Sequence, residues 1–440
     1  MANVIKLQDR VNLKFDYGKG SYIFDKKGRR YIDGSCGPLA SCLGHGNKEV
    51  NLAVHEQMNK ISYACISWSR TEILDELTEI ICSNIRAELN NIIYVMSGSE
   101  SVDSSLNISL AYHRANGNPN KNKIISRECS YHGNTLFSRS ASGLGKRKFG
   151  FENEIIPVEF VSFPNVYRPP EDILPENIVE YCAKEFEESI LSSGPENVAA
   201  FIFEPVGGAS SGGVTMPPGY TKKIREICDR YDIILIADEV MCGSGRTGTW
   251  SAMEQESVHP DIMTMAKGLS GGILPLGAVA YSDKIHQSIM DHYGTMLVGG
   301  TYSGHAACCA AAVAVHKIIA RDKLLERIAV KSPYLFERLR SRFQGSEYVG
   351  DVRGRGYMIG IEIVEDKATK KPFSSELSVY SRLAKQTLAN GLICFPMGGC
   401  VDGVSGDHVL LAPPYNASDK ELDEIIDIFC TSLHQVTSSL

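Results

Sequence analysis

The sequence predicts an α/β protein: a large domain with a mostly parallel central sheet flanked by helices, and a small α+β domain formed by both chain ends. The first observation is a pair of apolar runs of strand length, residues 198–203 and 233–237. The second is the segment between them, 217–232, which carries apolar side chains at helical spacing. A strand, a helix and a second strand, with both strands apolar throughout, are typical of a crossover unit in a parallel sheet.

The elements before this unit are short strands followed by helices. Residues 20–25 and 27–33 predict a hairpin, because two short strand-like runs flank a turn that contains Gly28. From about residue 48 to 116 the pattern is helical, and the apolar run 92–96 interrupts it as a strand.

The elements after the unit mix helices and strands. An alanine-rich helix is expected from His305 to about Ala320, and later examples are a helix at 422–433 and a strand at 358–364. We therefore expect three segments: the N-terminal part of the small domain (1–50), the large domain (51–325) and the C-terminal part of the small domain (326–440).

Composition excludes several classes of protein. With 43% hydrophobic and 22% charged residues among 440, the chain is typical of a globular protein. Its 45 Lys and Arg against 52 Asp and Glu give a net charge of −7, whereas a dedicated nucleic-acid binder shows a basic excess. The longest nearly uncharged stretch, 262–282, contains four glycines, a proline and a lysine, so we expect no membrane span.

Cysteine and histidine patterns favour a reducing compartment and give no support to a zinc site. The thirteen cysteines are odd in number and form no C-x-x-C pair, and the eleven histidines form no H-x-x-x-H pair. We therefore expect reduced thiols, no metal ion and a cytoplasmic location. The first residues also show no apolar core of signal-peptide length.

Lys267 is the only charged side chain between residues 262 and 282. An amine held in an apolar site has a lowered pKa and becomes nucleophilic, which is what Schiff-base chemistry requires. A lone lysine in a loop is also commonly a solvated side chain, so this feature alone leaves both interpretations open.

An acidic pair, Asp238-Glu239, follows the strand 233–237. Ligands of open α/β sheets bind beyond the carboxyl ends of the strands, although an acidic loop or a helix cap has the same sequence pattern. A Schiff base with pyridoxal phosphate needs an acid to keep the ring nitrogen protonated, and Asp238 is placed to serve. Glu204 ends the neighbouring strand and should emerge at the same edge of the sheet.

The segment Ser97–Ser101 lies between a predicted strand and a helix expected at 102–114. Gly98 lets a ligand approach the backbone, and the N–H groups of a helix start together with serine hydroxyls suit a phosphate. A serine-rich N-cap, with Glu100 and Asp103 stabilising the first turn, explains the segment equally well.

Residues 243–248 match the G-x-G-x-x-G dinucleotide pattern letter for letter. The match lacks its structural context, because no helix is expected after it and Asp238-Glu239 separates it from the preceding strand. We therefore reject a nicotinamide or flavin fold.

Taken together, these pieces resemble the class III aminotransferases, which are pyridoxal-phosphate enzymes of fold type I. The resemblance runs from about Gly20 to the last helix, with motifs in the family's order. These motifs are Leu43-Gly44-His45-Gly46, Ser97-Gly98-Ser99-Glu100, Tyr131-His132-Gly133, Glu204-Pro205-Val206 with Gly212-Gly213, Pro217-Pro218-Gly219-Tyr220, Asp238-Glu239-Val240 with Gly245-Arg246-Thr247-Gly248, Ala266-Lys267-Gly268 and Gly300-Thr301-Tyr302-Ser303-Gly304.

The resemblance implies an enzyme that moves an amino group, by a ping-pong mechanism, between an amino acid, ω-amino acid or amine and a keto acid or aldehyde. Lys267 would hold pyridoxal 5′-phosphate as an internal aldimine, then move a proton between the substrate Cα and the cofactor C4′. Asp238 would pair with the pyridinium nitrogen, while Tyr131 and Val240 would lie against the two ring faces.

The resemblance also implies a phosphate site shared between two subunits. Gly98 and Ser99 would bind the phosphate with the help of Thr301 from a second subunit, so the smallest active unit would be a homodimer. His132 and Glu204 would be further residues at the cofactor.

Two departures from the family pattern limit the prediction of a substrate. Met241 stands where many relatives have a glutamine that bonds the phenolic oxygen of the cofactor. Leu410 stands where many have an arginine for the substrate carboxylate, and residues 391–415 contain no arginine or lysine. Arg70, or less suitably His408, would have to bind a carboxylate, unless the substrate presents none there.

The missing arginine favours an ω-amine or ω-amino-acid enzyme within the family. A decarboxylase, aminomutase or racemase on the same scaffold stays an alternative, because such enzymes share Lys267 and Asp238. A non-catalytic binding protein is disfavoured, because it predicts damage to these residues or to the phosphate segment, and all are intact.

Overall fold

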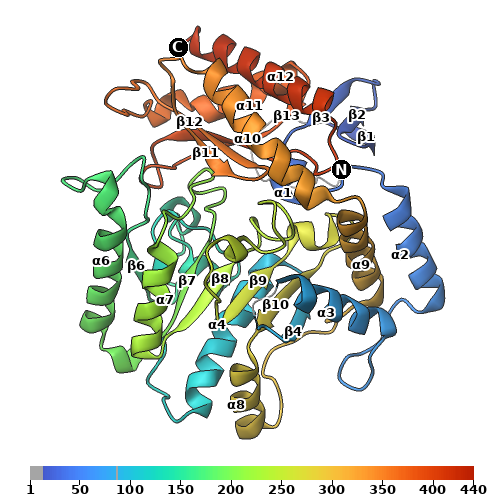
Figure 1. Ribbon diagram of the computed structural model, residues 1–440, viewed down its shortest axis with the longest axis vertical. Coiled ribbons are helices and arrows are strands. Elements are labelled where there is room, and N and C mark those ends of the chain that lie inside the picture. The colour runs from blue at the N-terminus through green and yellow to red at the C-terminus, as the bar shows by residue number, and fades with distance from the viewer. Residues whose placement is uncertain (1–12, 86–87) are drawn as a thin grey trace.

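The computed structural model describes residues 13–85 and 88–440, so residues 1–12 of the predicted N-terminal segment lie outside the description. Its largest sheet has seven strands and two further sheets have four strands each. Figure 1 shows the large sheet in the lower body of the molecule, with helices on both sides, and the last helices in an upper layer beside the first strands.

The seven-stranded sheet has the order β4-β10-β9-β8-β7-β5-β6. β10 runs antiparallel to both of its neighbours, whereas the pairs β9–β8, β8–β7, β7–β5 and β5–β6 are parallel. The strands are β4 (Asn91–Val95), β5 (Lys123–Arg127), β6 (Val158–Val161), β7 (Val198–Phe203), β8 (Ile234–Asp238), β9 (Ile262–Met265) and β10 (Gly277–Tyr281). The predicted α/β class with a mostly parallel sheet is thereby confirmed.

Helices cover both faces of this sheet because its central strands are buried on both sides. Phe201 and Phe203 of β7 join the core with α3, α6 and α7, while the alternate residues Ala200 and Ile202 join the core with α4 and α8. The helices of this part are α2 (Lys48–Lys60), α3 (Glu72–Ile85), α4 (Gly98–Ala115), α5 (Leu136–Ala141), α6 (Ile178–Ser193), α7 (Tyr220–Tyr231), α8 (Asp283–Tyr293) and α9 (Ala306–Arg321).

The two small sheets unite segments from opposite ends of the chain. Leu392 of β13 pairs in parallel with Ile32 of β3, which joins the N-terminal hairpin to the C-terminal part. The first sheet contains β1 (Phe15–Lys19), β2 (Tyr22–Asp25), β3 (Arg30–Asp33) and β13 (Leu392–Ile393), and the second β11 (Val349–Arg355), β12 (Met358–Ile363), β15 (Asp407–Leu411) and β14 (Phe395–Gly398). The remaining helices are α1 (Cys36–Leu39), α10 (Leu324–Arg342), α11 (Val379–Ala389) and α12 (Asp419–Thr437).

Short 3₁₀ turns complete the elements, and two of them bear on the site described below. They are η1 (Gly145–Arg147), η2 (Pro175–Asn177), η3 (Pro195–Asn197), η4 (Ala252–Gln255), η5 (Lys267–Ser270) and η6 (Ser375–Leu377).

Two helices begin earlier in the structure than the sequence pattern predicts. α4 begins at Gly98 instead of residue 102, because the Ser97 hydroxyl accepts the Glu100 N–H and caps the helix. α12 begins at Asp419 instead of residue 422, because Ser418 and Glu421 form a capping box. In both helices the first turn is set by polar capping residues. Hydrophobic periodicity does not reveal this turn, because it contains few apolar side chains.

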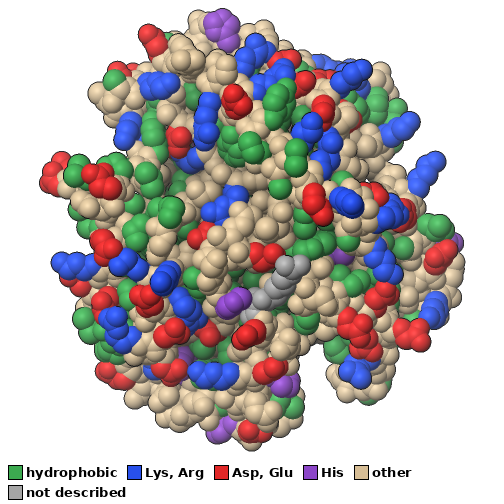
Figure 2. Space-filling model, in the orientation of Figure 1, with side chains coloured by type: hydrophobic (Ala, Val, Ile, Leu, Met, Phe, Trp, Pro, Cys, Tyr) green, Lys and Arg blue, Asp and Glu red, His purple; other side chains and the backbone are tan. Residues whose placement is uncertain are grey.

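The face of the molecule shown in Figure 2 has no large patch of one charge. Figure 2 shows acidic and basic side chains mixed across that face. Within residues 13–85 and 88–440, no helix is long and apolar enough to cross a membrane. In the same ranges, no cluster of three or more His, Cys, Asp or Glu side chains could hold a metal ion.

Candidate active site

Two neighbouring strands deliver two acids to one edge of the large sheet. β7 and β8 pair in parallel, with Phe203 opposite Ala237, so the next residues Glu204 and Asp238 leave the sheet side by side. Both side chains are only 4% exposed. Buried carboxylates need hydrogen-bond donors around them, and each of these two has them.

Three donors hold the Asp238 carboxylate in place. His132 Nδ1 lies 2.6 Å from Oδ2, while Oδ1 accepts the Thr264 hydroxyl at 2.9 Å and the Val240 N–H at 3.1 Å. His132 Nε2 is buried and has no hydrogen-bond partner within the described part of the chain. Asp238 is thus oriented by residues from three separate segments.

Lys267 begins the short turn η5, directly after β9. Its φ angle is +49°, a left-handed conformation that costs a non-glycine residue about 1–2 kcal/mol and is often found at functional sites. Burial lowers the pKa of the Lys267 amine to about 8, although the carboxylates of Asp238 and Glu204 act to raise it. About a tenth of this amine is therefore neutral and nucleophilic at pH 7, far more than for an ordinary lysine.

The start of α4 approaches the same place. A Cβ added to Gly98 would lie 2.7 Å from Val240 Cγ1 and 3.6 Å from the Cβ of Ala266, the residue before Lys267. The Ser99 hydroxyl donates to Asn134 Oδ1 at 3.0 Å and accepts the Asn134 N–H at 3.1 Å. The helix N-terminus, with its free N–H groups, therefore lies beside Val240 and the lysine turn.

Glu204 fixes the segment that contains Tyr131. Its Oε2 accepts the Tyr131 N–H at 3.2 Å and its Oε1 accepts the Gly208 N–H at 3.0 Å. Burial raises the pKa of Glu204 above its ordinary value. Tyr131 itself is half-buried, which leaves part of its ring available to a ligand.

Thr301 is placed differently from the other predicted residues. It is exposed, in the loop between α8 and α9, and lines a cavity of about 440 Å³ together with Met96 and Glu100. It also lines a cavity of about 760 Å³, with Tyr63 and Ile66. Within the described part of the same chain, Thr301 forms no hydrogen bond with Lys267 or Asp238.

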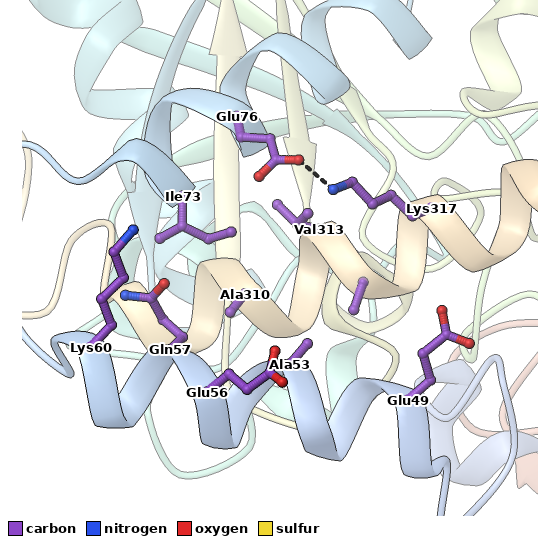
Figure 3. A pocket seen from close by; sticks show the side chains of 11 residues that line it. Glu49, Ala53, Glu56, Gln57, Lys60, Ile73, Glu76, Ala310, Val313 and Lys317 are labelled. Atoms are coloured by element: carbon purple, nitrogen blue, oxygen red, sulfur yellow. Dashed lines mark ion pairs between the residues drawn. The ribbon is translucent and has the colours of Figure 1, made fainter.

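A further cavity, of about 380 Å³, lies between α2, α3 and α9 and holds none of the predicted site residues. Figure 3 shows its apolar floor of Ala53, Ile73, Ala310 and Val313, and an ion pair between Glu76 and Lys317 at its border. Its two lysines, Lys60 and Lys317, are largely exposed and each is paired with a glutamate, whereas the Lys267 amine at the sheet edge is buried.

The two positions that depart from the family pattern lie together in an apolar cluster. Met241 and Leu410 are both buried and pack with Leu39 and Met358. His408, the weaker candidate for a carboxylate, is fully buried, and burial lowers its pKa to about 3, so the ring is neutral near neutral pH. A neutral buried imidazole supplies no cation to a substrate.

Sequence reasoning missed two residues that hold the others in place. Thr264 bonds Asp238, and Asn134 bonds Ser99. Thr264 carried a usable signal, because it is the only polar residue in the apolar strand Ile262–Met265. Asn134 directly follows the Tyr131-His132-Gly133 motif but has no periodic pattern to mark it.

This fold and this set of side chains define a pyridoxal-phosphate-dependent transferase. The chain belongs to the class III aminotransferases: the family model described as "Aminotransferase class-III" matches residues 6–433. The enzyme is therefore an aminotransferase, and its cofactor is pyridoxal 5′-phosphate.

Known proteins resemble the chain over nearly its whole length. An uncharacterized aminotransferase of Schizosaccharomyces pombe is 39% identical over 96% of this chain and 92% of its own. Gamma aminobutyrate transaminase 2 of Solanum lycopersicum is 36% identical over 97% and 92%. An amine transaminase of an uncultivated Pseudomonas species, solved with bound pyridoxal phosphate, is similar with a TM-score of 0.90, 29% identity and coverage of 100% and 97%.

The residues present fit this cofactor. Gly98 keeps the space beside Val240 and Ala266 that a Cβ would fill, which leaves room beside the helix N-terminus. The Asp238 carboxylate is buried and held by three hydrogen bonds, which suits it to bind a cationic ring nitrogen. Lys267 offers the neutral amine that carbonyl chemistry requires.

Proposed function

We propose that Lys267 is the residue that holds the cofactor and moves the proton during amino transfer. The observation that carries this proposal is a buried amine with a pKa near 8 beside the paired acids Asp238 and Glu204. Pyridoxal 5′-phosphate supplies an electron sink for the bond broken at the substrate Cα. The Lys267 amine would take the proton from the substrate Cα as general base and deliver it to the cofactor C4′ as general acid.

The remaining residues bind and orient. Asp238, held by His132 and Thr264, accepts the N–H of the cofactor ring and keeps that ring protonated. The N–H groups at the start of α4, with Gly98 and Ser99, bind the phosphate. Tyr131 and Val240 would hold the ring between them, and Glu204 fixes Tyr131 through its backbone N–H.

Replacement of the lysine tests this assignment. Lys267→Ala should lower turnover by at least about 10²-fold, the range for loss of a positioned proton-transfer group. It should also abolish the visible absorption band that an amino donor bleaches in the wild type. Lys184→Ala, on the surface of α6 with its side chain 76% exposed, is the matched control and should keep both. Full turnover by Lys267→Ala would refute the assignment.

The substrate we propose is an ω-amine or ω-amino acid, with a keto acid or aldehyde as acceptor. Leu410 fills the position of the usual carboxylate arginine, and the similar proteins include a gamma aminobutyrate transaminase and an amine transaminase. A screen of donors against bleaching of the cofactor absorbance, then of acceptors against its return, tests this. Exclusive use of α-amino acids would contradict the proposal.

We further propose that two copies form a homodimer in which Thr301 reaches the phosphate site of the partner subunit. Large apolar side chains are exposed around the cavities beside Thr301: Trp68 is 82% exposed, Leu297 53% and Tyr302 55%. Exposed apolar side chains gathered in one region mark a protein interface. Trp68→Glu should therefore give a monomer in sedimentation, whereas Phe149→Glu, equally exposed at 84%, should leave the dimer intact.

Mixing two inactive variants distinguishes a shared site from a separate one. In a heterodimer of Lys267→Ala with Thr301→Glu, a Thr301 that acts across the interface leaves one site with both residues native, so activity returns. A Thr301 that acts within its own subunit leaves one defect in each site, and activity stays absent. Absence of complementation in a proven heterodimer would contradict the shared site.

We also propose a cytoplasmic location and two domains divided near residues 50 and 325. Eight of the thirteen cysteines are buried, which suits a reducing compartment. The domain division is supported by the core that unites residues from both chain ends. Cell fractionation tests the location, and limited proteolysis tests the boundaries, because cleavage should concentrate between domains.

A further inference from the structure

An anionic substrate requires a cation that the usual position of the family does not supply. Leu410 is fully buried in β15, and no arginine or lysine lies between residues 391 and 415. Arg70 is exposed at the start of α3, where its Nε lies 3.9 Å from Asp75, and no contact joins it to the described site residues. The cation for a substrate carboxylate must therefore be sought elsewhere.

Arg147 lies over the ring of Tyr131. It is the last residue of η1, it is exposed, and its guanidinium carbon is 5.4 Å from the ring centroid. Tyr131 in turn donates its N–H to Glu204 at the edge of the sheet. Arg147 therefore stands beside the aromatic side chain that borders the proposed cofactor site, and its contact with the ring limits where the guanidinium can go.

The guanidinium of Arg147 is not engaged elsewhere. No hydrogen bond or ion pair of this group is found within the described part of the chain. Four basic side chains near the site are each bound to a carbonyl oxygen of the protein: Arg127 to Glu204, Arg139 to Asn134, Lys146 to Val404 and Arg246 to Pro413. The next residue, Lys148, is half-buried with its amine over the Phe160 ring, and burial lowers the pKa of that amine to about 8. Arg147 thus combines an exposed position with a guanidinium that has no hydrogen bond or ion pair in the described part of the chain.

The loop that packs against η1 contains one acid, Asp402, whose carboxylate bonds to the backbone of its own loop. Lys146 of η1 donates to the Val404 carbonyl at 2.8 Å, so this loop packs against the turn that holds Arg147. The Asp402 carboxylate on the loop accepts the N–H groups of Val404 and Ser405 at 2.8 and 2.5 Å. Its charge is therefore directed to its own loop, and Arg147 is left for an external anion.

We propose that Arg147 binds the carboxylate of the substrate, either the distal carboxylate of an ω-amino acid or that of the oxo acid acceptor. This deepens the proposed function and rests on it. A guanidinium presents two parallel N–H groups that match the two oxygens of a carboxylate, so it selects a carboxylate over an uncharged group of the same size. Arg147 is then a specificity-determining residue, while Lys267 performs the chemistry.

Matched ligands with and without a carboxylate test the proposal. For Arg147→Gln, the ratio of kcat/KM for 4-aminobutyrate to that for n-butylamine should fall about 10- to 100-fold, the range for loss of a charge-assisted bidentate contact. The fall should come mainly from KM, and Arg147→Lys should recover part of it. Lys146→Gln, in the same turn, and Arg70→Gln should keep the wild-type ratio.

A binding measurement on the holoenzyme gives a readout that does not depend on turnover. In calorimetric titration, Arg147→Gln should raise the dissociation constant of butyrate far more than that of butyramide. Equal loss for both ligands would reveal a merely structural cation–π contact and overturn the proposal, as would a selective loss in Arg70→Gln. A wild type that converts n-butylamine but discriminates against 4-aminobutyrate also overturns it, whereas a wild type with no transaminase activity contradicts the proposed function instead.

Discussion

His132 Nδ1 and Asp238 Oδ2 lie 2.6 Å apart, and both side chains are buried at the carboxyl edge of the large sheet. The two residues are 106 positions apart in the chain. The bond leaves Asp238 with one orientation, in which Oδ1 meets Thr264 and Val240. The position of the acid that would bind the cofactor ring thus depends on a histidine from another segment.

We expect His132→Leu to weaken cofactor binding and kcat/KM together by about 10- to 100-fold. A hydrogen bond to a charged group contributes about 1.5–3 kcal/mol, which corresponds to this factor. Fluorescence or absorbance titration of the apoenzyme with pyridoxal 5′-phosphate measures the first, and steady-state kinetics the second. His292→Leu, on exposed α8, is the control, and equal values for both variants would contradict the role of His132.

The Lys267 amine predicts how the rate of cofactor capture depends on pH. Because only the neutral amine attacks a carbonyl and burial lowers its pKa to about 8, capture should accelerate as the pH rises through 8 and then level off. An ordinary exposed lysine would still be gaining rate at pH 10. Stopped-flow mixing of apoenzyme with pyridoxal 5′-phosphate between pH 6 and 9.5 measures the midpoint. A midpoint above pH 9.5 would be incompatible with the buried amine.

The close approach of Gly98 to Val240 predicts a steric effect on cofactor affinity. In Gly98→Ala the new methyl would lie 2.7 Å from Val240 Cγ1, so the helix start or Val240 must move. Overpacking of this kind costs about 1–3 kcal/mol, and we expect a cofactor dissociation constant raised about tenfold or more. Val240→Ala in the same chain should restore part of the affinity by removing the clash.

A distant glycine provides the control for this substitution. A Cβ added to Gly345 would meet no atom within 4 Å, so Gly345→Ala should bind the cofactor as the wild type does. If Gly98→Ala binds equally well, the close packing beside Val240 has no bearing on the phosphate site.

A buried ion-pair network predicts a large effect on stability. Glu362 of β12 forms ion pairs with Arg353 of β11 and with Arg168, which precedes α6. Arg353 also donates to the carbonyl oxygens of Ser211 and Gly212, at 2.7 and 2.9 Å. Burial acts to raise the pKa of Glu362, but the two guanidinium groups outweigh it and hold that pKa below its ordinary value. The carboxylate is therefore ionised when the protein is folded at neutral pH.

We expect Glu362→Gln to lower the free energy of unfolding by about 3 kcal/mol, because it leaves the buried Arg353 guanidinium with only the partly exposed Asp351 as counter-ion. Denaturant titration followed by fluorescence measures the change. Glu376→Gln, exposed in η6, should change the stability by less than about 0.5 kcal/mol. A small effect at Glu362 would mean that water or other acceptors replace the carboxylate.

Local patterns in the sequence sufficed for the central unit and its edge. The runs 198–203 and 233–237 became β7 and β8, α7 followed between them, and Glu204 and Asp238 leave the sheet together. This succeeds because burial on both faces demands continuous apolar runs, and because parallel strands end at one edge. The family resemblance rests on motifs in order, and it was confirmed by the match to residues 6–433.

Tertiary structure alone decided which residues hold the predicted ones. Three contacts are examples: Thr264 with Asp238, Arg147 with Tyr131, and Glu362 with Arg168. Each joins segments that are far apart in the sequence, and no periodic pattern in the sequence indicates such a contact. The pairing of Leu392 with Ile32, which unites the chain ends, has the same character. Periodicity records whether a side chain faces a core, whereas contacts between distant segments depend on how all the elements pack together. The sequence by itself thus determined the family and the sheet and predicted Lys267 as the reactive lysine, and packing decided which residues surround it.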